Sequence, residues 1–346
     1  MPIRVIVVDD SPLMLRLISR ALNEDSDIHV VATATNAHDA RTAIKIHNPD
    51  VVTLDVEMPK MNGIDFLEKI MRLRPMPVVI VSTLTDAGTE TAVRALGLGA
   101  VECLAKPESG NAQATFGRLR EIVKAASKAK VKPFQDQKYR APSSDFKPSN
   151  KIISIGCSTG GVEALSEVLK TFPENCPPTL VVQHMPAAFT ATFARRLDGL
   201  VAPHVCEASE GAPLAIGQVY LAPGTSCHLQ LRRGRDGLVC RLDASDAVSG
   251  HRPSVDILFN SVAELIGKRA VGAVLTGMGR DGSAGLLAMR QSGARTIGQD
   301  ADTSLIYGMP RVAHELGAVE RQLPLSKIGP ELIRLCAKQN KENAAA

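Results

Sequence analysis

Apolar runs alternate with amphipathic stretches along the first 125 residues of the chain. Short runs rich in Val, Ile and Ala predict strands, and stretches with an apolar residue every three or four positions predict helices. The predicted strands are Val5–Val8, His29–Thr33, Val51–Leu54, Val78–Ser82 and Ala100–Cys103. The predicted helices are Leu13–Asn23, Ala37–His47, Asn62–Leu73, Glu90–Leu98 and Phe116–Lys124. Five such β/α units predict a parallel sheet covered by helices on both faces.

The same alternation returns after residue 150 and predicts a second, doubly wound α/β domain with a mainly parallel sheet. It opens with the apolar run Ile152–Ile155, followed by a helical pattern at Val162–Thr171. Further strands are predicted at Thr179–Val182, Ala270–Leu275 and Thr296–Gly298.

Residues 126–149 lack this regular apolar pattern and accumulate Lys, Ser and Pro. They hold six Lys or Arg against two Asp, which gives the segment a net charge of +4. Such composition is typical of a solvated tether. We therefore expect a domain at 1–125, a flexible basic linker at 126–149 and a second domain at 150–346.

Composition excludes several classes of function. The whole chain carries a net charge of only +4 and 3% aromatic residues, so neither a strong nucleic-acid field nor base-stacking platforms are expected. No apolar run is long enough to span a bilayer, and the first residues do not resemble an export signal. The seven cysteines, an odd number without close pairing, favour reduced thiols in a cytoplasmic protein.

Carboxylates follow two predicted strands of the first domain: Asp9 and Asp10 after the first, and Asp55 after the third. The carboxyl ends of parallel strands meet at one sheet edge, where three such groups repel one another unless a cation joins them. A hard ion such as Mg²⁺ suits oxygen ligands. One carboxylate could then accept a phosphoryl group, with Lys106 neutralising its oxygens and Ser82 hydrogen bonding to it.

Three reactive side chains follow predicted strands of the second domain. Ser158 comes after Ile152–Ile155, His184 after Thr179–Val182, and Asp281 after Ala270–Leu275. If they converge, His184 can take the proton of Ser158, while Asp281 holds the imidazole and stabilises its charge. Glycines around the serine, such as Gly156, would let backbone approach a substrate, and free N–H groups there could hold an oxyanion.

Each member has an alternative interpretation. Ser158 and Asp281 could simply cap helices, and a lone His at a strand end is often structural. Cys157 is an adjacent candidate nucleophile, although its place on the turn favours a side chain directed into the sheet. His251 is a second candidate base, although its Arg-Pro context better fits a shaped loop that orients substrate.

A further alternative is a dinucleotide site. The segment from Gly277 to Gly282 has the spacing G-x-G-x-x-G, and Asp300 lies 18 residues beyond it. Against this interpretation, Asp281 would place a negative charge in the turn that must hold a pyrophosphate.

The motifs of the first half resemble the receiver domain of bacterial response regulators, a flavodoxin-like (βα)5 fold. They are the DD pair, LDVEMPKMNG, the VST strand end and the AKP triplet. The resemblance implies that Asp55 is the phospho-acceptor, that Ser82 and Lys106 form the switch, and that a histidine kinase is the phosphodonor. It also implies a Mg²⁺ site made by Asp9, Asp10 and Asp55, with a backbone carbonyl from Glu57. Cys103 occupies a position that is usually aromatic or His in these domains.

The second half resembles the catalytic domain of chemotaxis protein-glutamate methylesterases. The motifs are GCSTGG, QHMPAAFT, the LAPG turn, HRPSVD, LTGMGRDGSAGL and YGMPR. The resemblance implies a triad of Ser158, His184 and Asp281, with Thr159 supporting His184 and the backbone N–H of Met278 stabilising the oxyanion. Cys157 departs from the alanine more common before the serine.

By the same resemblance, the substrates are glutamate methyl esters on methyl-accepting chemotaxis receptors, with deamidation of receptor glutamines as an accompanying activity. The hydrolysis itself needs no cofactor. Before phosphorylation of Asp55, the first domain is expected to cover or distort the catalytic cleft. A competing DNA-binding output fits poorly, because the second half is too long for a small helix-turn-helix module and lacks a basic stripe.

Overall fold

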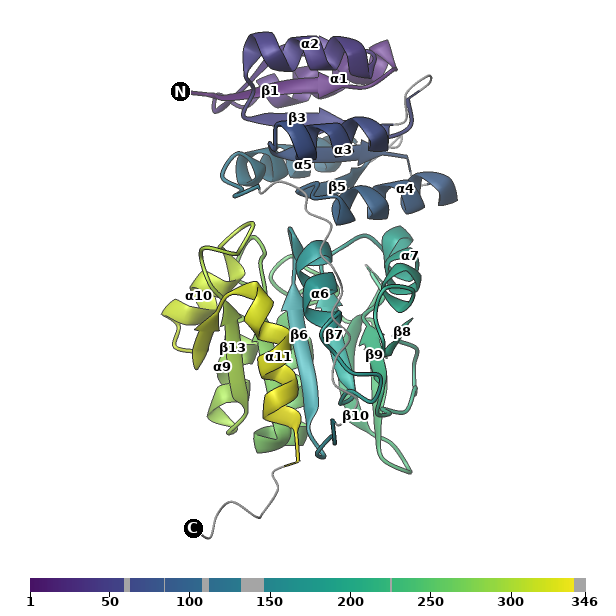
Figure 1. Cartoon of the computed structure of the whole chain (residues 1–346), viewed down its shortest axis with the longest axis vertical. Coiled ribbons are helices and arrows are strands. Elements are labelled where there is room, and N and C mark those ends of the chain that lie inside the picture. The colour runs from purple at the N-terminus through teal and green to yellow at the C-terminus, as the bar shows by residue number, and fades with distance from the viewer. Residues whose placement is uncertain (59–62, 84, 108–111, 132–145, 225, 339–346) are drawn as a thin grey trace. The chain divides into compact units, whose positions relative to one another are not determined.

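The computed structural model describes residues 1–58, 63–83, 85–107, 112–131, 146–224 and 226–338. The chain divides into two compact units, Met1–Gln137 and Lys138–Ala346. Each unit is built on a parallel sheet flanked by helices (Figure 1). Among the described residues, no helix has both the length and the apolar character needed to cross a membrane.

The sheet of the first unit has five parallel strands in the order β2-β1-β3-β4-β5. The strands are β1 Ile3–Val8, β2 Ile28–Ala34, β3 Val51–Leu54, β4 Val78–Ser82 and β5 Glu102–Ala105. The helices are α1 Pro12–Asn23, α2 Ala37–His47, α3 Gly63–Leu73, α4 Asp86–Gly97 and α5 Ala112–Ala126. Val8 pairs with Leu54, and the N–H of Asp55 donates to the carbonyl of Val8 at 2.9 Å. The register of β1 and β3 therefore brings the residues that follow them to one edge.

Element type was predicted correctly throughout this unit, but several boundaries were wrong. The fifth strand starts two residues later than expected, because Gly99 has a φ of +100° and ends the turn after α4, with Ala100 still hydrogen bonded to Ala95. Helices α4 and α5 each start four residues early, because their polar or small first turns carry no apolar periodicity. Asn62, the expected start of α3, lies outside the described residues.

The second unit contains a seven-stranded parallel sheet in the order β14-β13-β12-β6-β7-β9-β8 and a separate antiparallel hairpin, β10-β11. The strands are β6 Ile152–Cys157, β7 Thr179–Gln183, β8 His204–Glu207, β9 Gln218–Leu221, β10 His228–Arg233, β11 Leu238–Asp243, β12 Ala270–Val274, β13 Arg295–Gln299 and β14 Arg321–Leu323. The helices are α6 Gly161–Leu169, α7 Ala187–Asp198, α8 Val255–Ile266, α9 Ser283–Gln291, α10 Met309–Glu315 and α11 Leu325–Cys336, with the short 3-10 helix η1 Gly267–Arg269. The predicted α/β class is confirmed for both units.

Strand β6 lies at the centre of this sheet, between β7 and β12. It runs two residues further than predicted, because Gly156 and Cys157 continue the pairing with β7. A Cβ on Gly156 would lie 2.2 Å from Cγ1 of Val255, so this glycine makes room for α8, not for a substrate as expected. The longer strand carries Ser158 directly to the edge of the sheet.

Helix α8 packs against β6 and β12 and contributes a large part of the core. Its buried apolar residues recur every three or four positions, which places them on one face: Val255, Leu258, Phe259, Val262, Ala263 and Ile266. This face fixes the start of α8 beneath the carboxyl edge of the sheet.

Residues 146–149, the last four of the expected linker, pack on the second unit. Pro148 forms an antiparallel bridge with Ala337, and Ser149 donates from both its N–H and its hydroxyl to the carbonyl of Cys336, at 2.9 and 2.8 Å. At the other end of the expected linker, α5 extends to Ala126. Residues 132–145 lie outside the described part of the chain.

Candidate functional site

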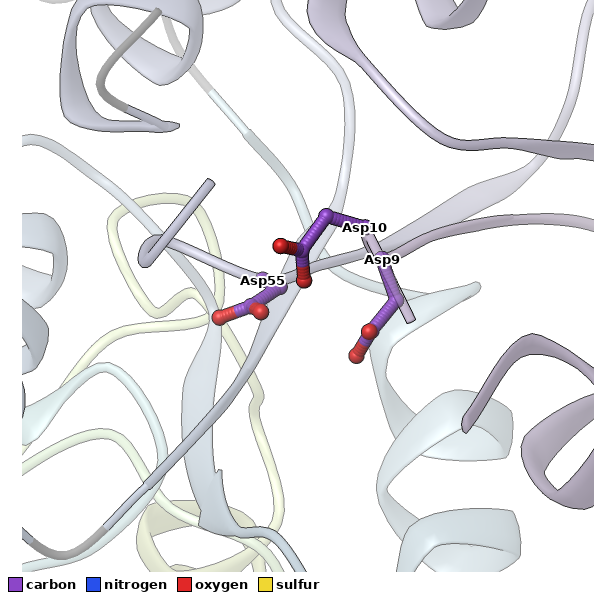
Figure 2. A group of neighbouring side chains, drawn as sticks. All are labelled: Asp9, Asp10 and Asp55. Atoms are coloured by element: carbon purple, nitrogen blue, oxygen red, sulfur yellow. The ribbon is translucent and has the colours of Figure 1, made fainter. Parts of the chain in front are cut away.

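The carboxyl edge of the first sheet holds a cluster of three aspartates, Asp9, Asp10 and Asp55 (Figure 2). One carboxylate oxygen from each lies within 4.8 Å of the others. The Asp9 and Asp55 side chains are buried, each only 1% exposed. Burial is the largest influence on Asp9, and it raises the pKa of that carboxyl despite the neighbouring lysine. Buried carboxylates this close favour the binding of a cation.

Lys106 supplies the positive charge at this cluster. Its Nζ lies 2.7 Å from Oδ2 of Asp55 and 2.8 Å from Oδ2 of Asp9. Burial disfavours the charged amine, but hydrogen bonds to Asp55 and Asp9 outweigh it and raise the pKa of Lys106. The backbone N–H of Lys106 also donates to the carbonyl of Ser82 at 2.8 Å, which ties β4 to the residue after β5.

Ser82 ends β4, and its side chain is fully buried. Its hydroxyl has no hydrogen-bond partner among the described residues. A buried hydroxyl without a partner is costly, so a hydrogen bond from Ser82 to an incoming group would be favourable. Asp55 follows β3 and Ser82 ends the neighbouring strand β4, so both lie at the same edge of the sheet. Their roles as phospho-acceptor and switch residue stay predictions.

Glu57 lies two residues after Asp55, and its N–H donates to Oδ1 of Asp55 at 3.0 Å. Its own carboxylate is held by the hydroxyls of Thr83 and Thr85, just beyond β4. The side chain is therefore engaged away from the aspartates, which leaves only a backbone carbonyl for the metal role that was predicted. Cys103, at the position that is usually aromatic, is a buried β5 residue only 3% exposed.

The donor set fits Mg²⁺, because it offers only hard oxygen ligands and carries net negative charge beside one lysine. Asp9, Asp10 and Asp55 would hold the ion. Once bound, it would supply charge neutralisation for a phosphoryl group arriving at Asp55.

At the carboxyl edge of the second sheet, Ser158 follows β6 and His184 follows the neighbouring strand β7. The N–H of His184 donates to the carbonyl of Cys157 at 3.1 Å. The side-chain amide of Gln183 donates to the carbonyls of Ser158 and His184 at 2.9 and 3.0 Å. These backbone bonds hold the serine and the histidine side by side at the ends of adjacent strands.

His184 and Asp281 form a direct pair, with Nε2 of the imidazole 2.8 Å from Oδ2 of the carboxylate. Both side chains are buried. Because the carboxylate accepts at this contact, Nε2 carries the proton and Nδ1 has a free lone pair. Nδ1 is buried and has no partner among the described residues. His184 therefore presents an unused proton acceptor on the side of the ring that does not face Asp281.

Asp281 is surrounded by donors. Its Oδ2 also accepts from the N–H of Val255 at 2.8 Å, and its Oδ1 accepts from the Ser254 hydroxyl at 2.8 Å and the Asp256 N–H at 3.1 Å. Burial alone would raise the pKa of the carboxyl. The interactions with His184, together with the Val255 and Ser254 donors, outweigh it and lower the pKa of Asp281 to about 2. The group is thus held as a carboxylate.

Ser158 is buried, with the residue only 7% exposed. Its hydroxyl has no hydrogen bond within the described part of the chain. The structure thus joins His184 to Asp281 and leaves the third member unpaired beside them. A loose nucleophile–base contact is common before a substrate binds.

The predicted supporting residues also lie at this edge. Thr159 follows Ser158, and its carbonyl accepts from the Thr276 hydroxyl at 3.0 Å. The backbone of Gly277 is held by two hydrogen bonds. Its N–H donates to the carbonyl of Ile306, and its carbonyl accepts from the N–H of Met309. The next N–H, that of Met278, has no acceptor among the described residues. An unpaired backbone donor beside a candidate nucleophile is the arrangement that an oxyanion requires.

The structure argues against Cys157 as the nucleophile. Its side chain is fully buried, and its Sγ lies 3.7 Å from the carbonyl of Val182. Burial raises the pKa of the thiol far above its ordinary value, so thiolate is not available. His251 contacts the site in a different way from a base: its ring stacks on that of His184, with centroids 3.8 Å apart and planes inclined by 6°.

The helix-cap alternatives are also wrong for these residues. Helix α6 begins after Gly160 and α9 after Gly282, and neither helix has a side-chain cap. Asp281 caps a different helix, α8, through the N–H groups of Val255 and Asp256.

The contacts of Gly277 and Asp300 argue against the dinucleotide interpretation. A Cβ on Gly277 would lie 2.8 Å from Cβ of Ser158, so this glycine lets the turn pack on the serine. The Asp300 carboxylate accepts from the N–H and hydroxyl of Thr303 within its own loop, at 2.9 and 2.6 Å. Neither group is arranged around a nucleotide.

Sequence reasoning missed Ser254 and the stacking of His251. A serine before an apolar helical run is ordinarily interpreted as a helix cap. The available signal was the cluster of polar residues in HRPSVD, directly before α8. That signal could mark the segment, but it could not show which distant strand end the segment contacts.

Comparison with known proteins gives matches over both units. The CheB methylesterase family matches residues 153–332, and the response regulator receiver domain matches residues 5–114. A protein-glutamate methylesterase/protein-glutamine glutaminase of Agrobacterium fabrum is 56% identical, with 96% of each chain covered.

One further relative matches almost the whole chain, and one solved structure matches the second unit. A Caulobacter vibrioides protein of the same name, numbered 1, is 58% identical over 97% of this chain and 98% of its own. The crystal structure of the Thermotoga maritima CheB methylesterase catalytic domain covers 54% of this chain and 99% of its own, at 39% identity and a TM-score of 0.53.

Proposed function

Because this chain belongs to the CheB methylesterase family and carries a response regulator receiver domain, we propose that it is a phosphorylation-activated protein-glutamate methylesterase. The observation that carries the proposal is the buried His184–Asp281 pair beside Ser158, at the ends of adjacent parallel strands. The relatives named above support the reaction class, a carboxylic ester hydrolysis with an accompanying glutaminase activity.

The proposed mechanism uses each group in the state that its contacts favour. Ser158 Oγ attacks the ester carbonyl while Nδ1 of His184 takes its proton, and Asp281 stabilises the imidazolium through Nε2. The Met278 N–H donates to the oxyanion, with Thr159 supporting the base. His184 then returns the proton to the leaving methoxide, and methanol departs. Water, activated by His184, hydrolyses the glutamyl ester on Ser158. A glutamine side chain would lose ammonia by the same steps.

The proposed substrates are glutamate methyl esters on methyl-accepting chemotaxis receptors, and the proposed phosphodonor is a histidine kinase. Such substrates and donors would place the enzyme in the cytoplasm. No nucleic acid and no membrane insertion enter the proposal, and no metal or organic cofactor is assigned to the hydrolysis. Mg²⁺ is assigned to the Asp9, Asp10 and Asp55 cluster.

The test is methanol release from a methylated receptor fragment, measured with and without Mg²⁺ and a small-molecule phosphodonor. We expect a basal rate that rises when the phosphodonor is added. No release from a fragment with verified methyl esters, under either condition, would contradict the proposed function.

Asp55→Asn should leave the basal rate unchanged and remove its stimulation by the phosphodonor. The amide is isosteric but cannot accept a phosphoryl group, and the 2.7 Å ion pair with Lys106 becomes a contact between the ammonium and an uncharged amide. A phosphoprotein gel and the methanol assay, run together, measure both effects. Asp50→Asn is the matched control, because the Asp50 carboxylate lies at an exposed site away from the cluster, where it accepts from the Arg4 N–H. Stimulation that persists in Asp55→Asn would refute the switch.

A further inference from the structure

The Asp281 carboxylate is held by four donors, and three of them come from one short stretch, Ser254 to Asp256. Two of the three are backbone N–H groups at the start of α8, and the third is the Ser254 hydroxyl, 2.8 Å from Oδ1. Without that hydroxyl, Oδ1 would keep only the longer contact of 3.1 Å with the Asp256 N–H. The hydroxyl therefore makes the shorter of the two hydrogen bonds to Oδ1 and helps to fix the carboxylate plane, and with it the direction of the bond to His184.

Ser254 does not use its side chain as a helix cap of the usual kind. It occupies the N-cap position of α8, yet its hydroxyl makes no capping bond to that helix. The side chain is fully buried, and its hydrogen bond is made to Asp281 instead. Asp281 caps α8 in place of Ser254, because its carboxylate accepts from the first N–H groups of the helix.

Ser254 is fixed from the other side by a buried histidine. Its N–H donates to Nδ1 of His228 at 3.0 Å, and Nε2 of His228 lies 3.0 Å from the carbonyl of Asp246. Because Nδ1 accepts and a carbonyl cannot donate, the proton of the His228 ring sits on Nε2. His228 starts β10 and is fully buried. The β10-β11 hairpin is thus linked to Asp281 through two side chains.

The two helices beside this link cap each other. Asp281, just before α9, caps α8, while Asp256 in the first turn of α8 accepts from the Gly285 N–H in α9 at 2.7 Å. Carboxylates at helix N-termini are favoured by the exposed N–H groups and the helix dipole. The reciprocal caps hold the backbones of Ser254 and Asp281 at a fixed separation. What remains free is the orientation of the Asp281 carboxylate, which the side-chain hydrogen bond from Ser254 restricts.

We propose that Ser254, anchored by His228, is a positioning residue that orients Asp281 and thereby the proton acceptor of His184. This inference rests on the proposed function of the triad. The hydroxyl does not touch the substrate, so its loss should affect the chemical step and leave substrate binding unchanged. Displacement of a catalytic group by up to about 1 Å from its productive position typically costs roughly 10- to 100-fold in rate.

The test compares Ser254→Ala with Ser261→Ala in the full chain, by methanol release from a methylated receptor fragment and by thermal unfolding. Ser261 is the matched control, because it also lies on α8 and also hydrogen bonds, but to Leu258 and Leu231 and not to Asp281. We expect kcat to fall about 10-fold or more in Ser254→Ala with KM unchanged. Ser261→Ala should lower the melting temperature without a comparable loss in kcat.

Three further variants keep the test decisive if Ser254→Ala does not fold. Ser254→Cys preserves side-chain volume but donates weakly and should show the loss in kcat, whereas Ser254→Thr retains the hydroxyl and should restore activity. His228→Leu, which leaves the Ser254 N–H without its acceptor, should give a milder loss of kcat. An unchanged kcat in folded Ser254→Cys overturns the proposal, and an unchanged kcat in folded His228→Leu removes the anchoring role.

Ser158→Ala, assayed in parallel, separates this inference from the proposed function. If Ser158→Ala is inactive and Ser254→Ala or Ser254→Cys has the wild-type kcat, the positioning role alone is wrong. If Ser158→Ala retains activity, the triad is wrong and the positioning role falls with it.

Discussion

Replacing Ser158 by alanine is expected to lower kcat for methanol release by roughly 10⁴- to 10⁶-fold, the loss found when the nucleophile of a serine triad is removed. The change deletes the only group at this edge that the proposed mechanism uses to form a covalent bond. Since the hydroxyl has no hydrogen bond within the described residues, its removal should leave the fold and the melting temperature intact.

Ser154→Ala is the matched control for this prediction. Ser154 lies on β6, the strand that Ser158 follows, is fully buried, and its hydroxyl also has no partner among the described residues. We expect Ser154→Ala to retain full activity. A Ser158→Ala enzyme that releases methanol at the wild-type rate would remove the nucleophile assignment.

Asp281→Asn is the second large effect, with an expected fall in kcat of about 10⁴-fold. The amide can donate as well as accept, so it favours the tautomer of His184 with the proton on the wrong nitrogen. The substitution also loses the charge that stabilises the imidazolium. Asp198→Asn is the control, because Asp198 pairs with His204 at 2.9 Å on the exposed surface of the same unit. Its activity should equal that of the wild type.

The same variant has a stability signature that depends on pH. The pKa of Asp281 in the fold, about 2, lies below its ordinary value of 3.8. A carboxyl whose pKa is lowered by folding stabilises the fold at pH values above its ordinary pKa. That contribution is lost as the pH falls through the pKa of the folded state. Asp281→Asn should therefore be less stable than wild type at pH 5, by a margin that narrows by about 2 kcal/mol as pH falls from 4 towards 2. Chemical unfolding at several pH values measures the margin. A margin independent of pH would contradict the lowered pKa.

Much of the fold follows from local pattern. The strands and helices of the first unit could be predicted because their apolar periodicities are strong, whereas in the second unit only four strands and one helix were predicted and the β10-β11 hairpin was not. Functional residues such as Asp9, Asp55 and His184 could be found because they lie at or just beyond the ends of apolar runs. Boundaries failed where the deciding contact was distant. The end of β6, for example, is set by pairing with β7 and by the close approach of Val255 to Gly156.

The candidate site was predictable only as a list of strand-end residues. The parallel topology implies that such residues meet at one edge, but it does not give the hydrogen bonds that orient them. Asp281 was predicted to hold the imidazole of His184, with a cap of its own helix as the alternative. It contacts His184 and caps α8 instead of α9, with Ser254 donating to it. These contacts join residues 25 to 27 positions apart, which no local pattern encodes.

The most direct test of the catalytic assignment is to inactivate the full chain with a serine-directed phosphonate and to map the modified peptide by mass spectrometry. The account predicts one phosphonyl group per chain, on Ser158, with methanol release lost in proportion to labelling. Modification of another residue with the same loss of activity, or full labelling of Ser158 with activity retained, would contradict it.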